Sequence, residues 1–168
     1  MKIHTLWLMA AIISAEVTCL SACHDRRKGL ASTIDMADTS TAGQLTAGFY
    51  GLEDQRWRWT AGDFSAMLEP PPGADDRGAW LRVQFYIPDS HIRQVGPVTL
   101  TADVEGEEFL PETVTTGGSF SYSRPVPAAA LRSNIVRVNF SFDKVLVPGN
   151  GDGRELGAVV TRLGLVSK

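Results

Sequence analysis

Cysteine and histidine are scarce in this sequence of 168 residues. The two cysteines, Cys19 and Cys23, lie close to the N-terminus, and His91 is the only histidine after residue 24. The rest of the chain therefore forms no disulfide and no thiolate metal site. Nucleophilic catalysis needs an activated nucleophile beside a base, and a single histidine offers little material for one. We expect no cofactor and no metal ion.

The sequence also lacks the motifs that mark common enzyme classes. It contains no GxSxG nucleophile elbow, no HExxH helix, no Walker loop and no glycine-rich dinucleotide motif. We predict that the protein is not an enzyme and has no catalytic residues. A small hydrolase is the alternative, because paired carboxylates such as Glu53 and Asp63 can serve a glycosidase without a fixed sequence spacing.

Two polar segments are interpreted as loops. The segment from Gly149 to Glu155 offers side-chain oxygens among glycines but lacks the spaced carboxylates of a calcium-binding EF-hand loop. We predict a hairpin turn there, in which Asp152 contacts Arg154 or Glu155. The segment around His91 is interpreted as a polar loop.

Basic residues do not outnumber acidic residues in this sequence. The sequence has 16 Lys and Arg against 19 Asp and Glu, so its formal net charge is -3. A mildly acidic chain has no electrostatic footprint for nucleic acid. Its one basic cluster is Arg26, Arg27 and Lys28. This cluster is either a solvated charge run or a group attracted to anionic lipid head groups.

No apolar run approaches the roughly 20 residues that a membrane-spanning helix needs. The run from Leu6 to Ala15 follows Lys2 and has the length of a signal-peptide core. The next motif, Leu20-Ser21-Ala22-Cys23, resembles the bacterial lipobox. The resemblance implies cleavage before Cys23, lipidation of its thiol with fatty acyl chains, and anchoring to a membrane. Ordinary secretion and an uncleaved start are the alternatives.

The lipobox divides the chain into three predicted regions: a lipoprotein signal peptide (1–22), a flexible linker (23–46) and a β-sandwich domain (47–168). The linker prediction depends on a composition rich in Ser, Thr, Ala, Gly and Asp, without sustained periodicity. A short helix from Leu30 to Ala37 is the alternative. The expected location is the cell envelope. His24 follows the cysteine where an aspartate would mark inner-membrane retention, so by resemblance to enterobacterial lipoproteins the outer membrane is expected.

After Ala47 the sequence breaks into short alternating stretches separated by Gly, Pro, Asn and Asp. The clearest strand is Ala79 to Ile87, and Val98 to Val104 alternates equally well. Further strands are expected near residues 48–52, 56–60, 64–68, 109–114, 119–123, 135–146 and 156–166. Only a short helical turn is expected, from Pro127 to Leu131. About eight strands with no long helix predict an all-β, antiparallel two-sheet sandwich of jelly-roll type, with an open barrel as the alternative.

The segment from Gly48 to Thr60 and the segment from Asp152 to Gly157 together resemble small bacterial β-sandwich modules associated with glycosyltransferases in surface-polysaccharide systems. The first runs from Gly48-Phe49-Tyr50, past Glu53, to Trp59-Thr60. The second is Asp152 to Gly157, which matches the closing Asp-x-Arg-x-Leu-Gly pattern of that family. The turn after Trp59-Thr60 is one residue longer than in the family pattern. The resemblance implies an association with carbohydrate.

The Arg-Trp-Arg-Trp stretch, Arg56 to Trp59, supplies candidate ligand-binding residues. In a strand Trp57 and Trp59 share one face, and Arg56 and Arg58 share the other. The tryptophans either pack against the core or form an aromatic platform for a sugar ring, with arginine as hydrogen-bond donor. Trp80 and Tyr86, on the outward face of the 79–87 strand, are further candidates.

Two functions of different classes are consistent with these observations. The first is a membrane-anchored envelope lipoprotein with a non-catalytic β-sandwich module that associates with carbohydrate. The second is a structural lipoprotein that binds another envelope protein. A contiguous exposed apolar patch would favour the second.

Overall fold

The structure is a computed structural model, and it describes residues 29–149 and 151–168. The predicted signal peptide, Cys23 and the basic cluster at 26–28 lie outside these residues. In the described part, no helix is long and apolar enough to cross a membrane.

Ten strands and four short helical segments make up the described chain. The helical segments are η1 (Thr39–Gln44), α1 (Ala74–Arg77), α2 (Asp89–Val95) and η2 (Ala128–Leu131). The strands are β1 (Thr33–Asp35), β2 (Leu45–Glu53), β3 (Trp57–Leu68), β4 (Ala79–Ile87), β5 (Val98–Val104), β6 (Glu107–Glu108), β7 (Glu112–Val114), β8 (Gly118–Val126), β9 (Val136–Phe142) and β10 (Val159–Ser167).

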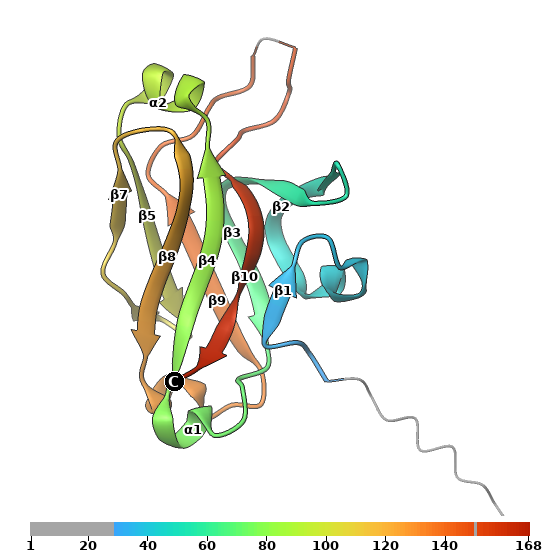
Figure 1. The fold of residues 1–168 in the computed structure, drawn as a ribbon, viewed down its shortest axis with the longest axis vertical. Helices are drawn as coiled ribbons and strands as arrows, with labels where there is room; N and C mark the ends of the chain where they lie inside the picture. Colours follow the sequence, from blue (N-terminus) through green and yellow to red (C-terminus); the bar gives the residue numbers. More distant parts are fainter. Residues whose placement is uncertain (1–28, 150) are drawn as a thin grey trace, which may run out of the picture.

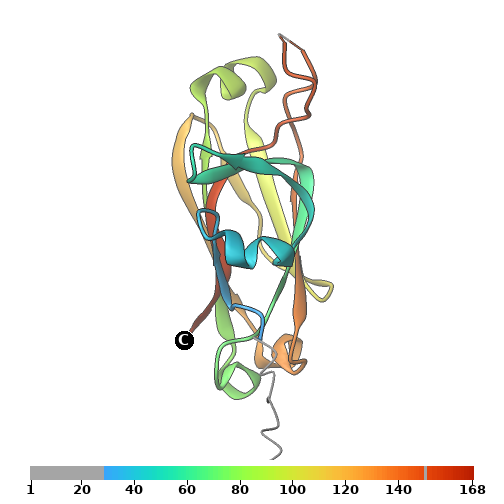
Figure 2. The ribbon, with the colours of Figure 1, turned by 90° about the vertical axis from the view of Figure 1, so that its right-hand side faces the viewer.

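The strands form one curled antiparallel sheet whose two halves face each other as a sandwich. The order is β6-β5-β9-β3-β10-β4-β8, with β1 on β10, β2 on β3 and β7 on β5. In Figure 1 strands β8, β4 and β10 lie in front of β7, β5 and β9. Figure 2 shows the β2–β3 hairpin passing from one half to the other along the side of the sandwich. The predicted β-sandwich is confirmed.

Period-two alternation determines the two best-defined strands. In β4 the odd-numbered residues from Ala79 to Ile87 are buried and the even-numbered residues point outward. In β5 the even-numbered residues from Val98 to Val104 are buried. Both strands have the bounds that the sequence predicts. Their inward side chains join one continuous hydrophobic core between the two halves.

The β2–β3 hairpin is longer than predicted, because the two stretches expected at 56–60 and 64–68 form one strand, β3. β2 crosses β3 with several register shifts between Leu45 and Leu52. At Gly48 the backbone has a φ of 71°, and a Cβ there would lie 1.9 Å from the carbonyl oxygen of Asp63. Only glycine permits so close a crossing.

The predicted flexible linker is too long. Residues 33–44 belong to the fold: β1 pairs with β10, and Ile34 and Met36 are buried in the core. The buried amide of Gln44 bonds both the N–H and the carbonyl of Ala31. Sequence periodicity did not find β1 because three residues are too few to display it. The short helix considered for residues 30–37 is also absent from the described chain, which has β1 in its place.

The polar loop predicted around His91 is also wrong. Residues Asp89–Val95 form α2, which has Pro88 as its N-cap and Gly96 as its C-cap. His91 is completely buried, and neither of its ring nitrogens makes a hydrogen bond of normal geometry in the described chain. Burial lowers the pKa of His91, because the charged imidazolium loses its hydration.

Candidate ligand-binding faces

The sequence-predicted ligand residues are distributed over β3, β4 and the turn that precedes β3. Trp57 and Trp59 are half-buried and lie outside the hydrophobic core cluster. Tyr86 is 42% exposed, and Trp80 is half-buried on the same outward face of β4. Packing of the two β3 tryptophans inside the core is therefore excluded, and all four aromatic rings retain exposed surface.

Strand pairing brings two of these rings onto one face. Trp59 pairs with Val159 of β10, Val159 pairs with Tyr86 of β4, and Tyr86 pairs with Ser119 of β8. Directly opposed residues project to the same side of a sheet, so these four side chains form one row on the outer face. Two strand spacings place Trp59 and Tyr86 about 10 Å apart. The row therefore places one aromatic residue on each side of Val159, which is itself only 9% exposed.

Polar side chains surround a hollow beside this row. A surface cavity of about 420 Å³ is lined by Tyr86 together with Gln84, Ser119, Ser121 and Thr161. Hydroxyl and amide groups both donate and accept hydrogen bonds. An apolar ring surface next to such groups suits a ligand that has one apolar side and a rim of hydroxyls.

The outer face continues along β4 toward Trp80. A second cavity of about 290 Å³ lies over Gly164 and is lined in part by Gln84, Arg82 and Arg162. Arg162 donates to Asp35 at 2.7 Å, and this bond holds the pKa of Asp35 below its ordinary value. Trp80 is six residues from Tyr86, which is about 20 Å along an extended strand. It therefore lies apart from the aromatic row.

The two arginines of the Arg-Trp-Arg-Trp stretch do not join the platform. Arg56 lies between β2 and β3 and is exposed. Arg58 pairs with Val160, which belongs to the buried core, so it faces away from the side that carries Trp59. Its Nη1 donates to the carbonyl of Tyr50 at 2.9 Å, and its Nε is buried without a partner. Arg58 is therefore a contact inside the β2–β3 hairpin.

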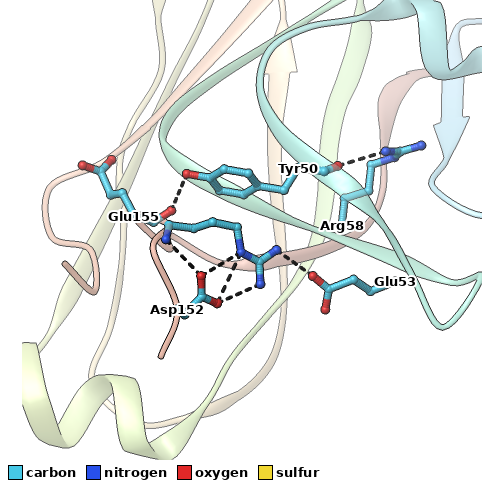
Figure 3. Close-up of polar contacts among 6 residues, drawn as sticks. Tyr50, Glu53, Arg58, Asp152 and Glu155 are labelled. Carbon is cyan, nitrogen blue, oxygen red and sulfur yellow. Dashed lines mark hydrogen bonds and ion pairs between the residues drawn. The ribbon is translucent and has the colours of Figure 1, made fainter. Parts of the chain in front are cut away.

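The two segments that resemble the polysaccharide-associated modules meet in space, where Tyr50 and Glu53 lie beside Asp152 and Glu155 (Figure 3). Arg154 donates to Glu53 at 2.7 Å and to both carboxylate oxygens of Asp152. These bonds lower the pKa of Asp152 and raise the pKa of the guanidinium. The hydroxyl of Tyr50 donates to the backbone carbonyl of Glu155 at 2.7 Å.

This contact network is structural. The Glu155 carboxylate also accepts from the backbone N–H of Gly62 at 2.9 Å. The hairpin before β10 is thus attached to the β2–β3 hairpin at several points. The predicted contact between Asp152 and Arg154 is confirmed. In the described chain, no group of three His, Cys, Asp or Glu side chains is arranged to hold a metal ion.

The carboxylate pair considered for a glycosidase is not assembled. Glu53 pairs with Trp57 at the start of β3 and binds Arg154, whereas Asp63 lies six residues further along β3. Six residues of strand span about 20 Å. Glycosidase carboxylates lie about 5–9.5 Å apart. Glu53 and Asp63 therefore cannot flank one glycosidic bond.

A polar groove that no local sequence pattern predicts lies on the other outer face, over β3, β9 and β5. Its volume is about 510 Å³, and Phe109 and Pro111 form one wall. Strand registers arrange its floor in two cross-strand rows, Asp63–Ser141–Thr101 and Ser65–Asn139–Asp103. Alternation identifies these residues as outward-facing, but only the strand order shows that the three strands are neighbours.

Hydrogen bonds within the groove fix its side chains. The Ser141 hydroxyl donates to one oxygen of Asp63 at 2.6 Å. The Asn139 amide donates to one oxygen of Asp103 at 3.0 Å, and the same oxygen accepts from the N–H of Gly106. Ser65 shares a hydrogen bond with Thr46 of β2 at 2.8 Å. The groove is therefore organised before any ligand enters.

No family model matches the sequence, and no curated protein shows significant similarity to it. Solved structures with a similar chain path include a family 35 carbohydrate binding module from Clostridium thermocellum, with a TM-score of 0.47 and 9% identity. That match covers 80% of this chain and 98% of the module. An acetyl xylan esterase from the rumen bacterium Butyrivibrio proteoclasticus has a TM-score of 0.44 at 8% identity, and the match covers 81% of this chain and 32% of the esterase.

A third structure, described as "CBM4 structure and function", has a TM-score of 0.35 and 11% identity. It aligns over 81% of this chain and 85% of its own. All three TM-scores are below 0.5, and no identity exceeds 11%. The chain itself folds as an antiparallel β-sandwich.

Proposed function

We propose that the protein is a membrane-anchored, non-catalytic envelope module that binds carbohydrate on the outer face of β10, β4 and β8. The observation that carries this proposal is the row Trp59–Val159–Tyr86–Ser119 beside a polar hollow. A pyranose ring has an apolar C–H face and a rim of hydroxyls. The C–H face suits the rings of Trp59 and Tyr86, while Gln84, Ser121 and their neighbours are placed to bond the hydroxyls.

Binding to an array of purified envelope polysaccharides tests this proposal, followed by titration of any glycan that binds. Tyr86→Ala should weaken binding about tenfold, because a buried aromatic contact contributes on the order of 1.5 kcal/mol. Tyr86→Phe keeps the ring and should retain most of the affinity. Ile135→Ala is the matched control, since Ile135 is similarly exposed but lies just before β9.

The proposal fails if no envelope polysaccharide binds, or if Ile135→Ala weakens binding as much as Tyr86→Ala. A circular dichroism melt of each variant separates loss of a contact from loss of the fold. Tyr86 is exposed, so its truncation leaves no internal cavity and should change the melting temperature little.

The alternative function, docking of another envelope protein, has weaker support. A docking surface of the usual kind is a contiguous apolar patch. The large apolar side chains that are exposed in the described chain, Tyr86, Leu110, Ile135 and Val147, belong to four separate segments. The hollow beside Tyr86 has four hydrogen-bonding side chains, Gln84, Ser119, Ser121 and Thr161, and these suit a hydroxyl-rich ligand better than an apolar protein surface.

Membrane anchoring through Cys23 is part of the same proposal, and its support is the resemblance to the lipobox. Ala31 is already held by Gln44, so seven residues lie between Cys23 and the fold, and the chain crosses this distance in eight Cα-to-Cα steps. Covalent geometry limits their reach to about 29 Å. The domain would therefore stay close to the bilayer.

The anchored end of the chain would enter the fold at one end of the sandwich, and Tyr86 of the aromatic row lies at the other end, away from the membrane. The chain enters β1 near the end of the sandwich that carries α1 and the C-terminus (Figure 1). Tyr86 lies at the far end of β4, next to α2.

Cys23→Ala should release the protein from the membrane fraction, and unchanged fractionation would refute lipidation at this residue.

A further inference from the structure

The groove over β3, β9 and β5 differs from the aromatic face in its charge. Three charged side chains line it, and all three are carboxylates: Asp63, Asp103 and Glu108. No lysine or arginine lines it, and Arg137, the next outward residue of β9, lies outside the lining. The groove therefore has a negative charge that its own walls do not neutralise.

The internal hydrogen bonds leave acceptor atoms for a ligand. Asp63 accepts the Ser141 hydroxyl through Oδ1, and Asp103 accepts Asn139 and Gly106 through Oδ1. The Oδ2 atom of each carboxylate has no such donor in the described chain, and neither has the carboxylate of Glu108. Ionised carboxylates accept hydrogen bonds from ammonium groups more strongly than from neutral donors.

We propose that this groove is a second binding site, and that its ligand is a hydroxyl-rich chain that carries protonated amino groups, such as an amino-sugar oligomer. Amino groups complement the three carboxylates. Hydroxyls complement the neutral floor groups Thr101 and Asn139, and the Phe109 wall accepts the apolar edge of a sugar ring. A basic peptide would satisfy the carboxylates alone, so the neutral floor favours a glycan.

Isothermal titration of the purified protein with a glucosamine hexamer tests the proposal, with the N-acetylated hexamer and hexalysine as comparison probes. The glucosamine hexamer should bind at least tenfold more tightly than the N-acetylated form, because a charge-assisted hydrogen bond is worth about 1.5 kcal/mol or more. Raising the salt concentration should weaken this binding, because ions screen exposed charges.

A double variant, Asp63→Asn with Glu108→Gln, locates the site. Both changes remove charge and keep the shape, and the new amide oxygen at position 63 still accepts the Ser141 hydroxyl. This variant should bind the glucosamine hexamer about tenfold more weakly. Asp76→Asn, on α1 at one end of the sandwich, changes a carboxylate outside the groove and should have no effect.

Several outcomes would overturn the proposal. Equal binding of the two hexamers, or no binding of either, removes the preference for amino groups. Hexalysine binding as tightly as the glucosamine hexamer shows that charge alone is recognised. Loss of glucosamine binding in Tyr86→Ala but not in the double variant moves the ligand to the aromatic face, which would leave the function proposed above intact.

Discussion

Arg154 Nη1 lies 2.7 Å from Glu53 Oε1 and joins two hairpins that are distant in the sequence. The same guanidinium holds Asp152 at 2.9 Å, and its Cζ lies 5.2 Å from the centre of the Tyr50 ring. A planar group with five donors can serve all these partners at once, whereas a lysine cannot. This geometry explains why an arginine stands between two carboxylates in the closing hairpin.

Arg154→Ala should therefore destabilise the fold by about 1 kcal/mol, a modest loss because the side chain is one-third exposed and solvent screens the pairs. Arg154→Lys should recover only part of that loss. Arg162→Ala is the control, because it breaks the more exposed pair with Asp35 and should cost less than about 0.5 kcal/mol. Urea unfolding of the three variants measures the differences, and equal losses at both arginines would contradict the prediction.

Gly48 and Gly51 both lie in β2, but they should respond differently to substitution. A Cβ at Gly48 meets the Asp63 carbonyl and the Phe64 Cα, and the backbone there has a positive φ. Gly48→Ala should cost about 3 kcal/mol or more, because the β2–β3 crossing must open. A Cβ at Gly51 meets nothing within 4 Å, so Gly51→Ala should change the melting temperature little. Comparable melting temperatures for the two variants would refute this account of the crossing.

The predictable parts of the fold are those in which sequence alternation and burial coincide. β4 and β5 alternate cleanly and have the predicted bounds, because each has one buried and one solvated face. The sequence predicts two strands in place of β3 because the small residues Ala61 and Gly62 interrupt the alternation of large apolar side chains. The sequence predicts a loop in place of α2 because the only fully buried residue of this helix is His91, which hydrophobic periodicity does not count, while Ile92 and Val95 are only partly buried.

The candidate sites were predictable only in part. The outward positions of Trp80 and Tyr86 followed from the pattern of β4. The neighbours of Tyr86 did not, because the row from Trp59 to Ser119 joins four strands, and strand order is not encoded in any local pattern. The groove over β9 was missed for the same reason. Its side chains are small polar residues that resemble any solvated strand face until their neighbours are known.

Substitution of Gln44 tests whether residues 31–44 belong to the fold. Its side-chain amide makes three hydrogen bonds, to both backbone groups of Ala31 and to the carbonyl of Met67 at 2.8 Å. Gln44→Ala should cost about 2 kcal/mol, since buried backbone groups lose their partners. It should also open the segment before η1 to limited proteolysis. Ser40→Ala, at an exposed position of η1, is the control. Proteolysis at the same rate in the wild type and in Gln44→Ala would instead support a flexible linker.

His91 should make stability depend on pH between about 7 and 5. Burial lowers its pKa in the folded state, whereas the unfolded chain keeps a value near 6.5. As pH falls below 6.5, His91 becomes protonated in the unfolded state but stays neutral in the folded state. The free energy of unfolding therefore decreases, by up to about 1.4 kcal/mol per pH unit. Asp35 and Asp152 have lowered pKa values, so their contribution is lost only at more acidic pH.

Replacing the titrating ring isolates this effect. His91→Leu removes the imidazole and fills the same buried site, so its stability should stay nearly constant from pH 7 to pH 5 while that of the wild type declines. Urea unfolding at pH 7, 6 and 5 measures both proteins. Because α2 closes one end of the sandwich, amide exchange in α2 and in the neighbouring turn at Gly117, which donates to Asp89, should accelerate first in the wild type. A parallel decline of wild type and variant would show that another group controls the acid sensitivity.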